Sequence, residues 1–320
     1  MPEPERDVPR VVLSTAEERF ERRRRTAGLF LGPTAFILLL ALPPAGLAPA
    51  AARLAAVVAW VLIWWITEPV PIPVTALLGP ALVVALGVGN AKVTFAPFGD
   101  PIIMLFLGGF LIAEAMRLHG LDRRIAFTLL GSRAVGGDPR RVLIAFAALA
   151  AGLSMWISNT ATTAMLYPIA LGVLAALDRV GTPTPETSTK TARFGIGLLL
   201  ACAFGSSIGG IATPVGTPPN LIAIGQLQAL AGIRISFVQW MAIAAPLTLI
   251  MLALAVVYLH RRFPAGVERS AEVRRALAAG RAGLPPLGRG ERNVLAAFAV
   301  AVTLWVVPGL IAAVADSPQA

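Results

Sequence analysis

Four polar residues interrupt one of the long apolar stretches of this chain. They are Ser154, Ser158, Asn159 and Thr160, within the sequence SMWISNTATTAML. The surrounding run, residues 143 to 177, is otherwise almost wholly hydrophobic, and polar groups inside a bilayer are costly enough to suggest a function. Their side-chain oxygens can form a neutral shell for a monovalent cation. A helix that begins just after them would direct its partially positive N-terminus at the same point, which favours an anion.

The composition is that of a helical membrane protein. Hydrophobic residues make up 57% of the 320 residues and charged residues 14%, against roughly 25% charged in soluble proteins. The net charge of +10 comes mainly from arginines in loops between apolar runs. Such charges set membrane topology, so we expect the lipid bilayer and no nucleic acid as a partner. We expect an all-α polytopic membrane protein, and not an enzyme, because the sequence offers no nucleophile with its base and no metal cluster.

The arginines also predict the orientation of the chain. Arg22 to Arg25 place the N-terminus in the cytoplasm of a multi-pass plasma-membrane protein, and residues 117–141 and 261–292 form further basic loops. These loops share one side only if the apolar run of residues 143–177 begins and ends there. That segment is long for one span and short for two with a turn. A re-entrant hairpin with arms of roughly 15 residues, turning at residues 158–160, fits both constraints; two tilted full spans would also fit the charges.

A second apolar stretch contains helix-breaking residues. The sequence AFGSSIGGIATPVGTPPNLIAIG, residues 203–225, combines several glycines with Pro214, Pro218 and Pro219. Consecutive prolines cannot continue a helix, so we expect a break around Gly216 to Pro219. Interrupted helices near the membrane midplane are the best indication in a sequence of a transporter's binding site. A kinked structural helix is the alternative, although a kink usually needs only one proline.

Two of these stretches resemble the signature sequences of a known family. SMWISNTATTAML and SIGGIATPVGTPPN closely resemble those of the divalent anion:sodium symporter family, the carriers of dicarboxylates, citrate and sulfate. The stretch PIIMLFLGGFLIAEAMRLHGLDRRIA resembles the family's fourth helix and its connector, and the resemblance extends from about Ala27 to Val314. It implies two inverted repeats, each with a broken helix and a re-entrant hairpin, that work by elevator-type alternating access.

The resemblance also implies the residues of the site. The expected sodium ligands are Ser154, Ser158, Asn159 and the backbone around Gly216. The expected substrate-binding residues are Asn159, Thr160 and Thr217. Bound Na⁺ would offset the charge of the anion and order the hairpin tip, and so raise the affinity for substrate.

The chain is expected to contain seven segments. They are a cytoplasmic tail (1–26), three transmembrane helices (27–90), a fourth helix with a basic connector (91–141), the re-entrant hairpin (142–178), the broken helix with the next transmembrane helix (194–260), a basic loop (261–293) and a last transmembrane helix (294–314). The last helix would open the second repeat. Family members carry a second Ser-Asn-Thr hairpin, and this sequence has one such triplet, so the chain is expected to be a fragment with its second repeat largely missing.

The expected function is sodium-coupled import of a divalent organic anion, with a C4-dicarboxylate such as succinate as the first choice. We expect a homodimer that co-transports Na⁺ and uses no organic cofactor. Two alternatives are sodium-independent dicarboxylate exchange and transport of sulfate or another oxyanion. A proton antiporter would need acidic residues in the broken elements, and these contain none.

Overall fold

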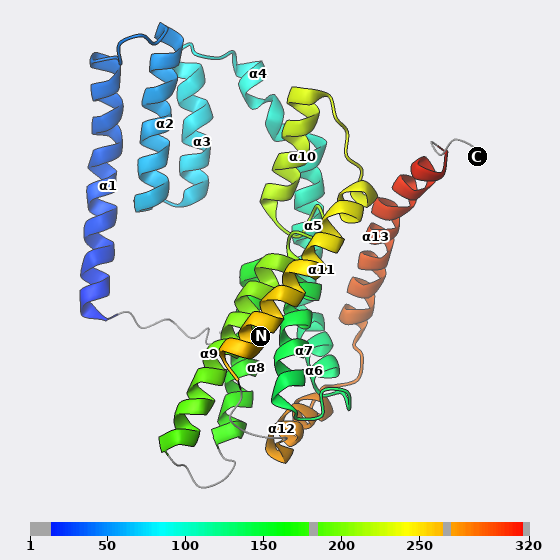
Figure 1. Cartoon of the computed structure of the whole chain (residues 1–320). Coiled ribbons are helices and arrows are strands. Elements are labelled where there is room, and N and C mark those ends of the chain that lie inside the picture. Colours follow the sequence, from blue (N-terminus) through cyan, green and yellow to red (C-terminus); the bar gives the residue numbers. More distant parts are fainter. Residues whose placement is uncertain (1–13, 179–184, 265–269, 316–320) are drawn as a thin grey trace, which may run out of the picture. The chain divides into compact units, whose positions relative to one another are not determined.

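The structure, a computed structural model, describes residues 14–178, 185–264 and 270–315 (Figure 1). Every regular element in these ranges is helical. Seven of the described helices are long and apolar enough to cross a membrane. The predicted class, an all-α polytopic membrane protein, is therefore confirmed. Contacts within the chain divide it into two compact units, Met1–Asp100 and Pro101–Ala320.

The first unit contains the N-terminal helices. They are α1 (Thr15–Ala41), α2 (Pro49–Thr67), α3 (Ile72–Ala85), α4 (Ala91–Phe95) and the 3₁₀ helix η1 (Ala96–Gly99). A capping box starts α1, because the Ser14 side chain accepts a hydrogen bond from the Glu17 amide and the Glu17 carboxylate accepts one from the Ser14 amide. The predicted tail, residues 1–26, is therefore helical from Thr15 onward. α3 has 14 residues and rises only about 21 Å, less than the hydrocarbon thickness.

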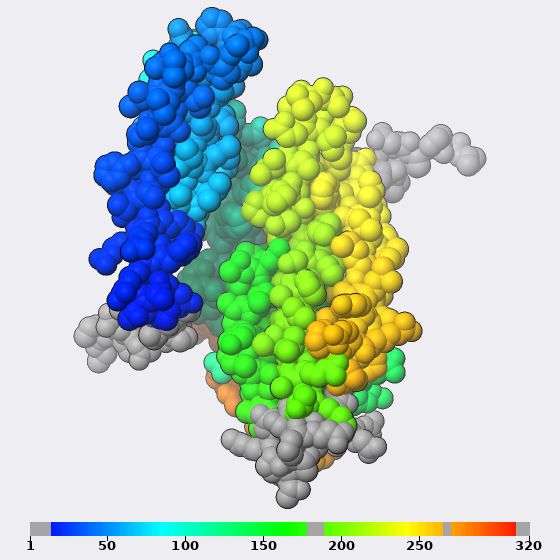
Figure 2. Space-filling view, turned by 60° about the vertical axis from the view of Figure 1, so that its left-hand side comes forward, coloured from blue at the N-terminus to red at the C-terminus, as the bar shows by residue number. Residues whose placement is uncertain are grey.

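The second unit is built around a central helix. Its helices are α5 (Pro101–Leu118), α6 (Leu121–Leu130), α7 (Pro139–Ser154), α8 (Asn159–Asp178), α9 (Pro185–Gly209), α10 (Pro218–Ala231), α11 (Phe237–Arg262), α12 (Ala271–Ala282) and α13 (Arg289–Ala315). α7 packs against α6, α8, α9 and α11 (Figure 1). Figure 2 shows one face of this unit, where α8 and α9 in green adjoin α10 and α11 in yellow. Leu143 and Phe146 of α7 are fully buried with Leu166 of α8 and Leu198 of α9.

The segment expected to form the hairpin consists of α7 and α8, which are separated by Met155 to Ser158. Asp138 caps α7 through hydrogen bonds from two backbone amides, and Pro139 occupies its first turn. One arm is longer than the roughly 15 residues expected for each. α7 has 16 residues and rises about 24 Å, whereas α8 has 20 residues and rises about 30 Å, enough for a full span. The length argument for a re-entrant segment thus applies to α7 alone, and the depth of the hairpin stays a prediction.

Two segments that were expected to be connectors contain amphipathic helices. α6 lies within the predicted connector after the fourth helix and buries Leu121, Ala126 and Leu130. α12 lies within the predicted basic loop, residues 261–293, and buries Val273 and Leu277. α12 packs against α6 and α8. Short helices with one apolar stripe bury that stripe against the protein and place charged residues on the opposite face.

Helices α7 and α9 approach each other closely because α9 carries two glycines on one face. A Cβ atom on Gly205 would lie 2.7 Å from the carbonyl oxygen of Ala147, and a Cβ atom on Gly209 would overlap the backbone of Ala151. Glycines four residues apart allow this kind of backbone contact between membrane helices, where van der Waals packing is the main source of association. The contact fixes the ends of both helices, Ser154 and Gly209, next to each other.

We predict that Gly209→Ala lowers the melting temperature in detergent by about 3 °C or more, because the added methyl group must push α7 and α9 apart. Cys202, the only cysteine, is buried on α9, so a thiol-reactive fluorogenic dye reports unfolding. The control is Gly152→Ala on α7, where a Cβ atom would meet no other atom within 4 Å. This control should melt at the same temperature or higher, because alanine favours a helix by about 1 kcal/mol over glycine. Equal melting temperatures for Gly209→Ala and the wild type would contradict the close helix contact.

Candidate functional site

The candidate site lies where two helical segments of the second unit are interrupted. α7 ends at Ser154 and α8 begins at Asn159, while α9 ends at Gly209 and α10 begins at Pro218. The two breaks are in contact. A Cβ atom on Gly216 would lie 2.5 Å from the carbonyl oxygen of Gly210 and 3.0 Å from that of Ser154. A Cβ atom on Gly210 would overlap the side-chain oxygen of Asn159. Only glycine fits at both positions.

The loop of residues 210–217 is held by two buried polar side chains. The Thr213 hydroxyl donates to the carbonyl oxygen of Met155 over 2.5 Å and accepts a hydrogen bond from the Gly216 amide over 3.1 Å. The Asn220 amide nitrogen donates to the carbonyl oxygens of Gly210 and Thr213, each at 2.8 Å. Irregular backbone inside a membrane is tolerated only where its polar groups are satisfied by protein or water. Thr213 and Asn220 therefore satisfy polar backbone groups of the loop.

The tip of the hairpin has its own local interactions. The Ser154 hydroxyl is fully buried and donates to Oδ1 of Asn159 over 2.6 Å. The Ser158 hydroxyl accepts a hydrogen bond from the Ala161 amide over 3.2 Å and so caps the first turn of α8. Between them, the indole ring of Trp156 packs edge-on against Phe298 of α13, with ring centroids 5.0 Å apart. The aromatic contact anchors one side of the tip to the start of α13.

The electrostatics of the site come from neutral groups. Among the described residues, no three His, Cys, Asp or Glu side chains cluster as metal ligands would. The stretches 154–160 and 203–225 contain no charged residue. The ends of α7 and α9 carry partial negative charge on their last carbonyl groups, whereas the starts of α8 and α10 carry partial positive charge on their first amides. The arrangement can therefore stabilise a cation and an anion in adjacent positions.

The predicted sodium ligands have different positions in the structure. Ser154, Asn159 and Gly216 are brought together with the carbonyl oxygen of Gly210. Ser158 is exposed and belongs to the cap of α8. In the part of the chain that the structure describes, no hydrogen bond joins Ser158 to the loop of residues 210–217.

The predicted substrate-binding residues stand at helix N-termini. Thr160 is exposed in the first turn of α8. Thr217 is half-buried at the cap position of α10, and its hydroxyl makes no capping hydrogen bond. Asn159 is half-buried and directs its side-chain oxygen toward Ser154, so its amide nitrogen is the donor available to a ligand.

The break in the second segment lies earlier than expected. It was predicted at Gly216 to Pro219, but the helix ends at Gly209, and Pro218 and Pro219 form the first turn of α10. Proline suits that position, because the first amides of a helix have no partner within it. Sequence reasoning also assigned no role to Thr213 and Asn220. The sequence did contain a signal for them, because Thr213 directly precedes Pro214 and Asn220 directly follows Pro219 in an apolar stretch.

The chain is similar in sequence to known proteins over most of its length. The family model described as the sodium:sulfate symporter transmembrane region matches residues 24–317. The sodium-dependent dicarboxylate transporter SdcS of Staphylococcus saprophyticus is 35% identical over 291 residues, which cover 87% of this chain and 54% of that protein. The transporter of the same name from Staphylococcus aureus strain USA300 is 36% identical over 236 residues, or 73% of this chain and 44% of that protein. The chain spans about half the length of these curated relatives.

The family match covers almost the whole chain, including both breaks and the helices that lead into them. The matched family is one of membrane symporters, and seven of the described helices are long and apolar enough to cross a membrane. The chain belongs to the divalent anion:sodium symporter family.

Proposed function

We propose that the protein is a sodium-coupled importer of divalent organic anions and that a C4-dicarboxylate such as succinate is its substrate. The observation that carries the proposal is the meeting of two helix C-termini and two helix N-termini at a cluster of neutral oxygens. Such a site favours a cation and an anion together and binds neither through a fixed countercharge. The relatives named as sodium-dependent dicarboxylate transporters support this choice of ion and substrate.

The sodium ion would bind between the hairpin tip and the loop. The ligands available are the Ser154 hydroxyl and carbonyl oxygens, Oδ1 of Asn159 and the backbone around Gly210 and Gly216. The Ser154 hydroxyl donates its hydrogen to Asn159, so its lone pairs remain available to a cation. Ser158 would contribute as a ligand only by releasing the Ala161 amide, which makes it the weakest member of the predicted set.

The substrate carboxylate would bind at the start of α8 and α10. The Thr160 and Thr217 hydroxyls and the Asn159 amide nitrogen can each donate to it, and the first amides of α8 add partial positive charge. Asn159 would couple the two sites, because its oxygen faces the sodium ligands and its nitrogen is free to face the substrate. Sodium binding would fix the orientation of this amide and so raise the affinity for the anion.

The wider assembly is part of the same proposal. The basic residues of α12 and of the loop that leads to α7 favour a cytoplasmic position for that end of the second unit, with the N-terminus on the same side. We infer a homodimer in the plasma membrane whose hairpin is re-entrant and whose substrate-binding unit moves by an elevator-type mechanism.

We predict that Asn159→Ala reduces sodium-driven succinate uptake by tenfold or more, because it removes one contact to the ion and one to the substrate. Uptake of labelled succinate is measured in proteoliposomes with an inward sodium gradient. Asn90→Ala is the matched control, since the Asn90 side chain caps the short helix α4 in the other unit. Uptake by Asn159→Ala at half the wild-type rate or above, in protein of normal melting temperature, would refute the assignment.

A second prediction concerns sodium binding alone. Saturating Na⁺ in place of K⁺ should raise the melting temperature by about 3 °C, since an ion that binds only the folded state stabilises it. Gly216→Ala should abolish this sodium-dependent rise, because its methyl group would occupy the space between the Gly210 and Ser154 carbonyl oxygens. Gly172→Ala on α8, where a Cβ atom meets no other atom within 4 Å, should retain it. A sodium effect that persists in Gly216→Ala would place the ion elsewhere.

A third prediction separates symport from exchange. Replacing Na⁺ by choline should reduce succinate uptake to the background of protein-free vesicles, because the cation that stabilises the bound anion is missing. Full uptake without sodium, driven by succinate inside the vesicles, would reject symport in favour of exchange. Competition by excess unlabelled anion then tests the substrate: succinate should inhibit and sulfate should not, and the reverse would identify a sulfate carrier.

A further inference from the structure

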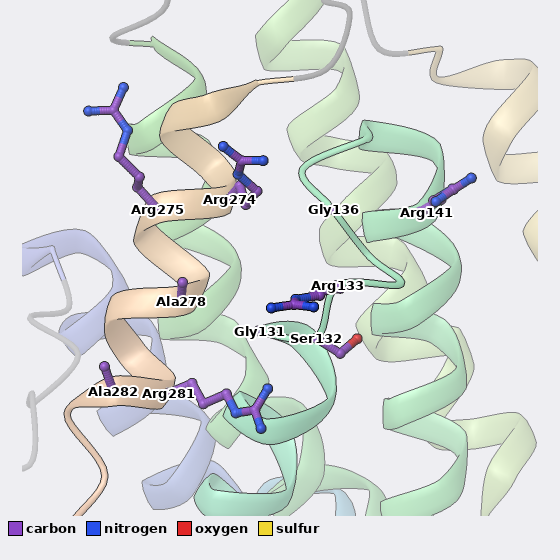
Figure 3. Close-up of a pocket in the computed structure, with 10 residues that line it drawn as sticks. All are labelled: Gly131, Ser132, Arg133, Gly136, Arg141, Arg274, Arg275, Ala278, Arg281 and Ala282. Atoms are coloured by element: carbon purple, nitrogen blue, oxygen red, sulfur yellow. The ribbon is translucent and has the colours of Figure 1, made fainter.

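The second unit contains an arginine-lined cavity that is separate from the broken helices. Its volume is about 800 Å³, and it lies between α12 and the segment that joins α6 to α7 (Figure 3). Five arginines line it: Arg133, Arg141, Arg274, Arg275 and Arg281. Small residues on both walls, including Gly131, Gly136, Ala278 and Ala282, leave the space between them open.

Three of the lining arginines, Arg133, Arg274 and Arg281, surround the open space of the cavity. Arg133 and Arg274 extend into the space between the two walls from opposite sides, and Arg281 borders it from the end of α12 (Figure 3). Within residues 14–178, 185–264 and 270–315, none of these three side chains forms an ion pair. By contrast, Arg275 pairs with Glu272 at 2.7 Å and points away from the cavity (Figure 3). Topology requires positive charge in a loop, but it does not require arginines from separate elements to converge.

The cavity also has a defined position relative to the membrane. α12 connects α11 and α13, two helices that are long and apolar enough to span a bilayer. The end of α11, the start of α13 and α12 must therefore lie on the same side. α12 buries Val273 and Leu277 against the second unit, where it contacts α6 and α8. This packing holds α12 against α8, one of the helices long and apolar enough to span a bilayer, so we expect the arginines of α12 to lie near lipid headgroups.

We propose that the arginine-lined cavity binds the phosphate group of an anionic phospholipid. Guanidinium groups bind phosphate oxygens through paired, charge-assisted hydrogen bonds. Basic pockets beside transmembrane helices on the cytoplasmic side are suited to such headgroups. A phosphate between Arg133 and Arg274 would relieve the repulsion between like charges on the two walls. It would also join α12 to the start of α7, and thus connect the lipid to the helix that ends at Ser154.

The test measures lipid binding to the purified 320-residue chain in detergent. The chain is titrated with dioleoyl phosphatidylglycerol or with dioleoyl phosphatidylcholine, and native mass spectrometry detects the bound lipid. We expect saturable binding of phosphatidylglycerol and at least tenfold weaker binding of phosphatidylcholine. The affinity of the variant R133Q/R274Q for phosphatidylglycerol should be about tenfold or more below that of the wild type. Each basic residue near a membrane surface contributes about a factor of five to the affinity for anionic lipid. The control R289Q/R292Q removes the same charge from two exposed arginines at the start of α13.

The outcomes decide between a site and a general charge effect. Unchanged binding in R289Q/R292Q together with weak binding in R133Q/R274Q would support the cavity. Equal losses in the two variants, or equal binding of the two lipids, would overturn it.

Inorganic phosphate and succinate are added as competitors. Displacement of the lipid only by phosphate at high concentration supports a phosphate site that the lipid occupies, whereas tight binding of either soluble anion without lipid binding would overturn the lipid assignment. Wild-type melting temperatures in both variants exclude misfolding as the cause.

Discussion

The structure of the second unit depends on one constraint: a helix that stops inside a membrane leaves backbone carbonyls and amides that lipid cannot satisfy. Two helices of this unit, α7 and α9, end within long apolar stretches, at Ser154 and Gly209. Thr213 and Asn220 satisfy backbone groups of both breaks, because their side chains donate hydrogen bonds to carbonyl oxygens there. Glycines at 210 and 216 bring the breaks into contact, so each completes the environment of the other.

The same constraint explains why a site for ions can be built without charged residues. Polar groups that must be present at a helix break already carry partial charge of a defined sign. Carbonyls at the ends of α7 and α9 suit a cation, and amides at the starts of α8 and α10 suit an anion. A buried carboxylate or arginine in their place would bind one ion permanently and resist its release. Under the proposed function, neutral groups let a bound cation supply the charge, which is a physical basis for coupling two fluxes.

The rest of the unit supports this centre in two ways. Close packing of α7 on α9 through Gly205 and Gly209 fixes the two helix ends with backbone contacts, which are stiffer than contacts between long side chains. The arginines lie outside the apolar core, on α12 and on the segment before α7. The breaks therefore lie in the apolar part of the unit, and these arginines lie at its basic end.

The sequence by itself determined the helical membrane class, the presence of two interruptions and the roles expected of Ser154 and Asn159. The class and the interruptions follow from local pattern, namely apolar runs and consecutive prolines, whereas the roles of Ser154 and Asn159 are implied by the resemblance to the family. Only the tertiary structure decided where the second break begins, because that depends on the contact between Gly209 and Ala151 and not on the prolines. The tertiary structure also decided that Thr213 bonds to Met155 and that Arg133 and Arg274 line one cavity, because the members of each pair lie far apart in the chain. Helix propensity depends on neighbouring residues and can be read from the sequence, whereas contacts between distant residues form only when the helices pack.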